Sequence, residues 1–300
     1  MANISIHPFT SAELAATDEV IIAAYHLAQG RKSTLQRYLT LQPNGAFVAK
    51  QGSRIVGFGA AKRYTSFAYI GLMAVHPALQ KQGIGGMLLE RILRWLDISG
   101  CSTVLLDAIP SAVPLYNHYG FVEDDITLVL QQEKEPVRSV NVVLGIPDVV
   151  RRSYGVSGGR DKSGPYAGEL PALFAYDAPY FGGDRATLLA SYWADDPQRV
   201  LMTKNALRQI TGYLIAQSSV LGPWVADTVE EAERLLVHAL TLSFKNRPGM
   251  FVSARHEDAL RLFERYGFMQ QRTLSHMRRG EKVQRGRYTT LYGQASLGLG

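Results

Sequence analysis

The chain has 300 residues, of which 46% are hydrophobic and 19% charged, which excludes a disordered polypeptide and is enough for two compact domains. Its single cysteine excludes an internal disulfide, and the sequence predicts neither a membrane span nor a signal segment, so we expect a cytoplasmic protein. The net charge of +6 is scattered rather than gathered in a basic stripe, which argues against nucleic acid as a partner.

Hydrophobic periodicity predicts alternating strands and helices in the first half of the chain. The expected strands are Ile4–Ile6, Ala46–Lys50, Ile55–Lys62, Phe67–Val75, Thr103–Asp107 and Thr127–Leu130. The expected helices are Ser11–Gln29, Ser33–Leu39, Ile84–Ser99 and Ala112–Tyr119. This order predicts an α/β fold with a twisted, mixed but mostly antiparallel sheet that is flanked by helices.

The segment at residues 75–89 reads V-H-P-A-L-Q-K-Q-G-I-G-G-M-L-L, a strand that enters a glycine-rich turn and then an amphipathic helix. Gly83, Gly85 and Gly86 lack Cβ atoms, so the backbone can approach a ligand and direct its N–H groups at phosphate oxygens. Lys81 adds a cation. The turn matches neither the dinucleotide pattern nor the nucleotide P-loop, and taken alone it is equally consistent with an ordinary loop.

The second half repeats the first with altered chemistry. Leu115–Phe121 matches Leu262–Phe268 at an offset of 147 residues, which predicts two copies of one fold. Aligned with the glycine-rich turn, the second copy has D-T-V-E-E-A-E at residues 227–233, where Asp227 or Thr228 can cap a helix and the carboxylates repel phosphate. We therefore expect one phosphate site per chain, with domains at residues 1–132 and 171–300 and a linker at 133–170.

The motif Gln80-x-x-Gly83-x-Gly85 after V-H-P resembles the acyl-CoA-binding motif of the GNAT acetyltransferase superfamily. A second block at residues 106–121, L-D-A-I-P-S-A-V-P-L-Y-N-H-Y-G-F, is similar to the late strand, helix and G-F turn of that superfamily. Segments at 177–185, 221–227 and 276–280 resemble the C-terminal domain of the YitH/HolE type of acetyltransferase. The resemblance implies an N-terminal catalytic GNAT domain followed by a degenerate GNAT-like domain.

The resemblance also implies that acetyl-CoA is the acyl donor, that no metal is needed, and which residues hold the donor. Backbone N–H groups on the strand before the loop would polarise the thioester. The donor-binding residues implied are Leu72, Met73, Ala74, Val75, Gln80, Lys81, Gln82, Gly83, Ile84, Gly85, Gly86 and Tyr116. Tyr116 corresponds to the tyrosine that often protonates the departing thiolate, and the second copy has Phe263 at this position.

The proton acceptor and the amine pocket are less determined by the sequence. Asp107 ends a predicted strand and is either a general base, acting directly or through water, or a cap or turn residue. His26 lies on the first helix, where superfamily members build the acceptor pocket. Tyr180 and Trp224 either line that pocket, with Asp177 binding a cationic amine, or belong to the core.

The sequence therefore predicts an N-acetyltransferase in which a small-molecule primary amine attacks the thioester directly. A two-domain cleft suits small ligands, so a protein amino terminus or lysine is the less favoured acceptor. Two alternatives stay open, a CoA-responsive binding protein without turnover and an interaction scaffold. A homodimer is also left open, whereas nucleic acid and membrane partners are not expected.

Overall fold

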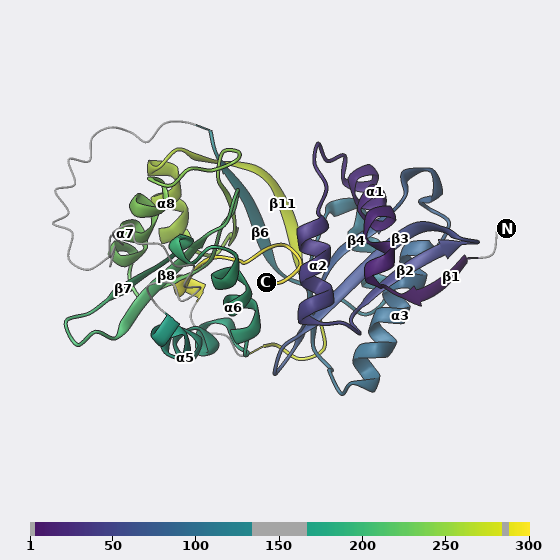
Figure 1. Ribbon diagram of the computed structural model, residues 1–300, viewed down its shortest axis with the longest axis horizontal. Coiled ribbons are helices and arrows are strands. Elements are labelled where there is room, and N and C mark those ends of the chain that lie inside the picture. Colours follow the sequence, from purple (N-terminus) through teal and green to yellow (C-terminus); the bar gives the residue numbers. More distant parts are fainter. Residues whose placement is uncertain (1–3, 134–166, 284–287) are drawn as a thin grey trace, which may run out of the picture. The chain divides into compact units, whose positions relative to one another are not determined.

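The computed structural model describes residues 4–133, 167–283 and 288–300, and these fold into two compact units (Figure 1). Unit 1 combines residues 4–124 with His276–Val283 and Leu299. Unit 2 holds the remaining described residues. The division therefore differs from the linear boundary expected at residue 132, and most of the expected linker at 133–170 lies outside the described residues.

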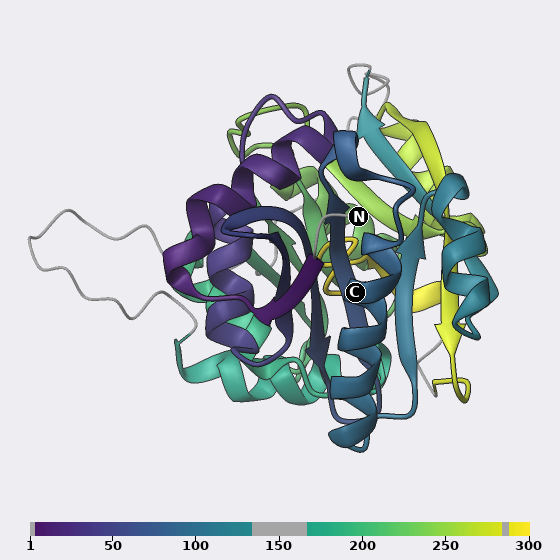
Figure 2. The ribbon, with the colours of Figure 1, turned by 90° about the vertical axis from the view of Figure 1, so that its right-hand side faces the viewer.

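Unit 1 is a sheet with helices on both faces. Its own strands are β1 (Ile4–Pro8), β2 (Ala46–Gln51), β3 (Arg54–Arg63), β4 (Ala68–Val75) and β5 (Val104–Ala108). Its helices are α1 (Leu14–Tyr25), α2 (Lys32–Leu41), α3 (Ile84–Ile98) and α4 (Val113–His118). Helices α1 and α2 lie on the opposite side of these strands from α3 (Figure 2).

Local sequence accounts for the buried face of α3 and for the end of α1. Helix α3 buries the stripe Ile84, Leu88, Leu89, Ile92, Leu93 and Leu96 against the sheet, as the periodicity predicted. Helix α1 ends at Tyr25, earlier than the predicted Gln29, because His26 takes a left-handed conformation with φ 52° that stops the helix. None of the helices within the described ranges is both long and apolar enough to cross a membrane.

Unit 2 repeats the pattern of strands and helices. Its own strands are β7 (Val200–Lys204), β8 (Ile210–Ala216), β9 (Leu221–Ala226), β10 (Gly249–Ser253) and β12 (Leu291–Gly293). Its helices are α5 (Leu170–Phe181), α6 (Ala186–Asp195), α7 (Val229–Ala239) and α8 (Glu257–Arg265). One four-stranded sheet has the order β12-β9-β8-β7.

Two long strands, β6 (Val122–Gln132) and β11 (Phe268–Arg279), each contribute to both units. They follow the two repeated Y-G-F turns and are therefore equivalent strands of the repeat. The eight-stranded sheet has the order β1-β2-β3-β4-β5-β11-β6-β10, so the long strand of each half lies next to the strand that precedes the long strand of the other half. Unit 1 consequently completes its sheet with residues that a division by sequence order assigns to the second domain.

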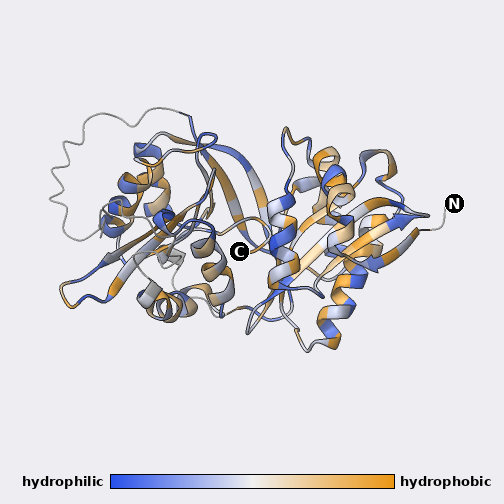
Figure 3. Cartoon of the chain, in the orientation of Figure 1, coloured by the Kyte–Doolittle hydropathy of each residue, from blue (hydrophilic) through white to orange (hydrophobic). Residues whose placement is uncertain are grey.

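Each unit has its own apolar core. In unit 1, α3 and α4 pack on the buried residues of β2 to β5, and Met277 of β11 belongs to this core. In unit 2, Trp224 and Phe263 lie at the centre of a core between β8, β9, α7 and α8. Figure 3 shows the corresponding concentration of apolar residues along the strands of unit 1. These two cores support the prediction of two folded domains.

His256 makes the stability of unit 2 depend on pH. Its fully buried ring accepts a hydrogen bond from Ala259 N at 3.2 Å and so caps α8, and burial lowers the pKa of His256 from 6.5 to about 4. The unfolded chain therefore binds a proton that the folded unit does not between these pH values. The free energy of unfolding is then highest above pH 6.5 and falls by about 2 kcal/mol at pH 5 through this residue.

The variant His256→Asn tests this pH dependence, because asparagine keeps a capping oxygen but does not titrate. Urea unfolding at pH 7 and pH 5 is expected to show a loss of stability in the wild type that exceeds the loss in the variant by about 2 kcal/mol. Equal losses in the two proteins would contradict the assignment.

Candidate functional site

The loop between β4 and α3, at residues 76–83, is held in shape by its own short-range hydrogen bonds. The His76 ring accepts a hydrogen bond from Ala78 N at 3.3 Å, and Gln80 Nε2 donates to Val75 O at 3.1 Å. Lys81 and Gly83 adopt left-handed conformations, with φ 61° and φ 83°. The backbone therefore bends at Lys81 and at Gly83 before α3 begins, and no side chain of the loop caps this helix.

The N-terminus of α3 is uncapped. Gly83 occupies the cap position and has no side chain, so the first-turn N–H groups of Ile84, Gly85 and Gly86 have no partner from a cap or from the helix itself. A Cβ atom at Gly85 would meet nothing closer than 3.6 Å, whereas one at Gly86 would lie 3.1 Å from the Tyr119 hydroxyl. Free N–H groups at the positive end of a helix suit a diphosphate, and Lys81 supplies a nearby cation.

Strand β4 carries a β-bulge next to this loop. Ala60 of β3 pairs with Gly71 and Phe58 pairs with Ala74, so Leu72 and Met73 together oppose the single residue between them on β3. Leu72 has φ 54°, which is unusual for a leucine and bends the strand locally. A bulge of this kind leaves backbone groups without ladder partners, and these lie where the family resemblance expects N–H groups to polarise a thioester.

Strands β4 and β5 are paired only at their beginnings. The parallel register joins Ala68 to Val104 and Tyr69 to Leu105, and the strands diverge after these pairs. The bulge on β4 therefore faces an unpaired edge of β5 that ends at Asp107 and Ala108. This divergence is an opening in the sheet between the second halves of β4 and β5.

Two tyrosines point at this opening from different helices. Tyr116 of α4 is 6% exposed, and its hydroxyl makes no hydrogen bond within the part of the chain that the structure describes. Burial, together with the Tyr25 hydroxyl, raises the pKa of Tyr116 well above its ordinary value, so the phenol keeps its proton at neutral pH. Tyr25 at the end of α1 donates a hydrogen bond to Met73 O at 2.9 Å. The sequence predicted an acceptor-binding role for the adjacent His26 but no role for Tyr25.

Asp107 is not a free carboxylate. Its side chain is fully buried, and it accepts hydrogen bonds from the Tyr69 hydroxyl and from His276 Nδ1, the latter at 3.0 Å. The Tyr69 hydroxyl also lies 3.4 Å from His276 Nδ1. Sequence spacing gave no sign of this cluster, because His276 is far from Asp107 in the chain and joins unit 1 only through the pairing of β11 with β5.

Two of the predicted acceptor-binding residues belong to the interior of unit 2. Asp177 is 1% exposed and is bound by Arg185 through Nε and Nη2, each at 2.8 Å, and by the Tyr213 hydroxyl. Trp224 is fully buried and stacks on Tyr292 at 5.3 Å between ring centres. The predicted role of both residues in an amine pocket is therefore corrected, because neither presents an atom to a ligand.

Of the other two predicted acceptor residues, His26 is exposed and Tyr180 is half-buried. His26 ends α1 in unit 1, one residue after Tyr25. Tyr180 of α5 lies in unit 2, where its hydroxyl and that of Tyr176 both donate to Asp227 Oδ1, at 2.7 and 2.9 Å. Tyr180 therefore satisfies a carboxylate of its own unit, and His26 remains the predicted acceptor residue that lies in the unit of the loop.

The second copy has no loop comparable to residues 76–83. Only Asp227 and Thr228 separate β9 from α7, and the Thr228 hydroxyl caps α7 by accepting a hydrogen bond from Glu231 N at 3.3 Å. The aligned acidic segment at 227–233 is thus the helix start itself rather than a substituted loop. The predicted cap is confirmed, and this helix end has no free first-turn position for an anion.

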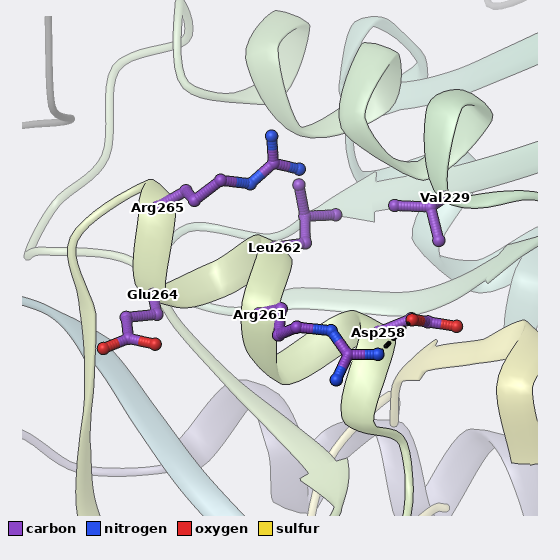
Figure 4. A pocket seen from close by; sticks show the side chains of 6 residues that line it. All are labelled: Val229, Asp258, Arg261, Leu262, Glu264 and Arg265. Atoms are coloured by element: carbon purple, nitrogen blue, oxygen red, sulfur yellow. Dashed lines mark hydrogen bonds and ion pairs between the residues drawn. The ribbon is translucent and has the colours of Figure 1, made fainter. Parts of the chain in front are cut away.

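A pocket of about 440 Å³ lies between α7 and α8 in unit 2 (Figure 4). Its lining residues are Val229, Asp258, Arg261, Leu262, Glu264 and Arg265. Arg261 is held by Asp258 at 2.6 Å, and Arg265 lies 3.4 Å from Glu233. Because these cations are already neutralised by carboxylates, the pocket does not offer the unpaired positive charge that a diphosphate needs.

The glycine-rich loop that opens α3, the bulged strand β4 and the diverging strands β4 and β5 lie together in unit 1. Models of the acetyltransferase (GNAT) domain match the chain at residues 42–123 and at residues 173–293, which together make up more than half of it. The chain therefore belongs to the GNAT acetyltransferase family and carries two such domains in tandem.

Curated relatives and solved structures agree with this family. The chain is 39% identical over 71 residues to the uncharacterized N-acetyltransferase ycf52 of Gracilaria tenuistipitata var. liui and 32% identical over 73 residues to that of Porphyra purpurea. These alignments span 23% and 24% of the chain, and 39% and 42% of the relatives' own lengths.

Two crystal structures share the fold over almost the whole chain. A candidate acetyltransferase from Pyrococcus horikoshii has a TM-score of 0.80 at 24% identity, covering 100% of this chain and 97% of that one. The GCN5-related N-acetyltransferase from Sphaerobacter thermophilus has a TM-score of 0.65 at 14% identity, covering 94% and 98%. At these identities the likeness is one of fold.

Proposed function

We propose that the protein transfers the acetyl group of acetyl-CoA to a primary amine of a small molecule, by direct attack of the amine on the thioester. The uncapped, glycine-lined N-terminus of α3 is the observation that carries this proposal, because it matches the diphosphate of CoA in charge and geometry. Residues 80–86 would hold the diphosphate, and the bulge at Leu72 and Met73 would face the thioester carbonyl.

Catalysis at such a site needs positioning and charge stabilisation rather than a covalent intermediate. Backbone N–H groups at the bulge would stabilise the oxyanion that develops on the carbonyl oxygen. The protonated Tyr116 hydroxyl is available to give its proton to the departing sulfur, since burial keeps the phenol neutral. The second copy has Phe263 at this position, which agrees with a single reaction centre per chain.

Thiol release tests the proposal directly. Acetyl-CoA is incubated with a panel of acceptors, namely spermidine, free lysine, an alkyl diamine and a peptide with a free amino terminus, and free thiol is measured with a disulfide dye. The chain's one cysteine, Cys101, is buried and does not contribute a fast background. Turnover with a small amine is expected. Binding of acetyl-CoA without turnover across the panel would favour a CoA-responsive binding protein, and turnover with the peptide alone would favour a protein N-acetyltransferase.

The variant Tyr116→Phe is expected to lower kcat by about 100-fold, because it removes the proton donor for the leaving thiolate. The KM for acetyl-CoA should stay within about twofold, since the ring and its packing on Phe121 are kept. Tyr266→Phe is the matched control, because Tyr266 lies in unit 2 and bonds Glu233 at 2.8 Å. A Tyr116→Phe enzyme with wild-type kcat would remove Tyr116 from the mechanism.

A further inference from the structure

We propose that His276, which lies late in the sequence, takes the proton from the acceptor amine in unit 1, with Asp107 and Tyr69 as its positioning residues. This inference rests on the proposed function and names the proton acceptor for that reaction. It replaces the prediction that Asp107 itself is the base, because the Asp107 side chain is fully buried and bonds His276, whose side chain is 9% exposed.

The three side chains lie on one face of the sheet in unit 1. Side chains alternate along a strand, and the neighbours of each residue point into the core beneath α3. These neighbours are Ala68, Ile70, Leu106, Ala108 and Met277. Tyr69, Asp107 and His276 therefore face the opposite side, which carries α1 and α2 (Figure 2). Helix α3 lies on the first side, and the proposal has the amine reach the thioester from the second.

The hydrogen bonds of Asp107 determine which nitrogen of His276 is the base. The carboxylate only accepts hydrogen bonds, so His276 Nδ1, at 3.0 Å from Asp107 Oδ1, carries the proton of that contact. The second carboxylate oxygen accepts from the Tyr69 hydroxyl. The neutral imidazole then has its lone pair on Nε2, the arrangement in which a buried carboxylate orients a histidine base.

Nε2 is open to a ligand. The His276 side chain is 9% exposed, and within the described residues its hydrogen bonds involve Nδ1. Nε2 is not among the fully buried atoms and keeps some contact with solvent. Arg278 lies two residues further along β11, on the same face as His276. It forms an ion pair with Asp124 of β6 at 3.6 Å. The titratable groups in contact with the imidazole are therefore Asp107 of β5 and Tyr69 of β4.

The cluster lies level with the reaction centre. Tyr69 pairs with Leu105 in parallel register, so two residues further along, Asp107 is level with Gly71, directly before the bulge at Leu72. The ladder between β4 and β5 does not reach this level, and β11 with His276 lies next to β5. The proposal places the amine at this level, between a thioester carbonyl at the bulge and Nε2.

The proton and electron balance follows from this placement. A protonated amine gives one proton to His276 Nε2, and its freed lone pair forms the C–N bond at the thioester carbonyl carbon. The C–S bond breaks with its electron pair on sulfur, which takes the proton of Tyr116. The nitrogen then loses a second proton, which restores Tyr116, and His276 releases its proton to solvent. The products are the amide, the free thiol and one proton.

The test compares His276→Asn with the wild type, because the asparagine amide can still donate to Asp107 but has no lone pair in place of Nε2. With the acceptor that turns over best in the panel, kcat is measured from pH 6 to pH 9, and acetyl-CoA binding is measured by calorimetry. We expect kcat to fall by about 100-fold or more, with acetyl-CoA affinity within about twofold. The dependence of kcat on pH should differ between the wild type and the variant, because the asparagine side chain does not accept a proton. His7→Asn, on the exposed edge strand β1, is the matched control.

A second variant keeps the test decisive if His276→Asn folds poorly. Asp107→Asn preserves shape but lets the side chain donate to Nδ1, which moves the imidazole proton to Nε2, so kcat should again fall by at least about tenfold with donor binding intact. A wild-type rate and pH profile in both variants would overturn the role of His276 while the proposed function stands. Loss of acetyl-CoA binding in either variant would show a structural role instead. A wild type that transfers to no amine would overturn both proposals.

Discussion

Gly85→Glu is expected to weaken acetyl-CoA binding by at least about 100-fold while leaving the fold intact. The new side chain lies in the first turn of α3, where its carboxylate occupies the anion position and repels the diphosphate. The fold should tolerate it, because a Cβ atom at Gly85 has only ordinary contacts, with Leu115 at 3.6 Å and Val75 at 3.9 Å. A carboxylate near a helix N-terminus is in itself favourable.

Calorimetric titration of acetyl-CoA into the whole chain measures this effect and the number of sites together. We expect one site per chain in the wild type, abolished in Gly85→Glu and retained in Gln36→Glu, which adds the same charge on the exposed part of α2. Two sites would contradict the inference that the second copy, with Thr228 capping α7, does not bind the donor. No site in the wild type would favour the interaction-scaffold alternative.

The backbone course from β4 through the glycine-rich loop into α3 could be predicted from the sequence because its determinants are contiguous. Glycines, a preceding strand and a following amphipathic stripe lie within fifteen residues, and each acts on its own backbone. The same holds for most elements of the first half, whose burial pattern follows from local periodicity. The bulge at Leu72 and Met73 could not be predicted in this way, because it depends on register against β3 rather than on composition.

The contacts of Asp107 with Tyr69 and His276 could not be predicted from sequence spacing, because His276 lies on β11, which pairs with β5 of the other half. His276 enters unit 1 because β5 pairs with β11, and this pairing is a property of the whole sheet. The predicted pocket roles of Asp177 and Trp224 are corrected for a different reason, namely that contacts within unit 2 bury both side chains. Asp177 has an acidic side chain that suits an amine, but Arg185, only eight residues away, satisfies it in the core.

Arg185→Met is expected to lower the free energy of unfolding of unit 2 by about 3 to 5 kcal/mol, because it leaves the Asp177 carboxylate buried without its cation. The guanidinium is 2% exposed and donates two hydrogen bonds of 2.8 Å to Asp177, one of 3.0 Å to the Tyr213 hydroxyl and one of 3.2 Å to the backbone oxygen of Gly300. It also lies over the Phe181 ring at 4.0 Å. Methionine keeps much of this packing but replaces none of the donors.

A double-mutant cycle separates the cost of an orphaned charge from the value of the pair itself. Asp177→Leu combined with Arg185→Met removes both charges, and we expect this double variant to be more stable than Arg185→Met alone, since no unpaired ion is then buried. Urea unfolding is followed by tryptophan fluorescence in a Trp95→Phe background, in which the remaining Trp193 and Trp224 both lie in unit 2 and report on this unit. If Arg185→Met unfolded with wild-type stability, the ion pair would not hold the unit together, and Asp177 would again be available as a ligand for an amine.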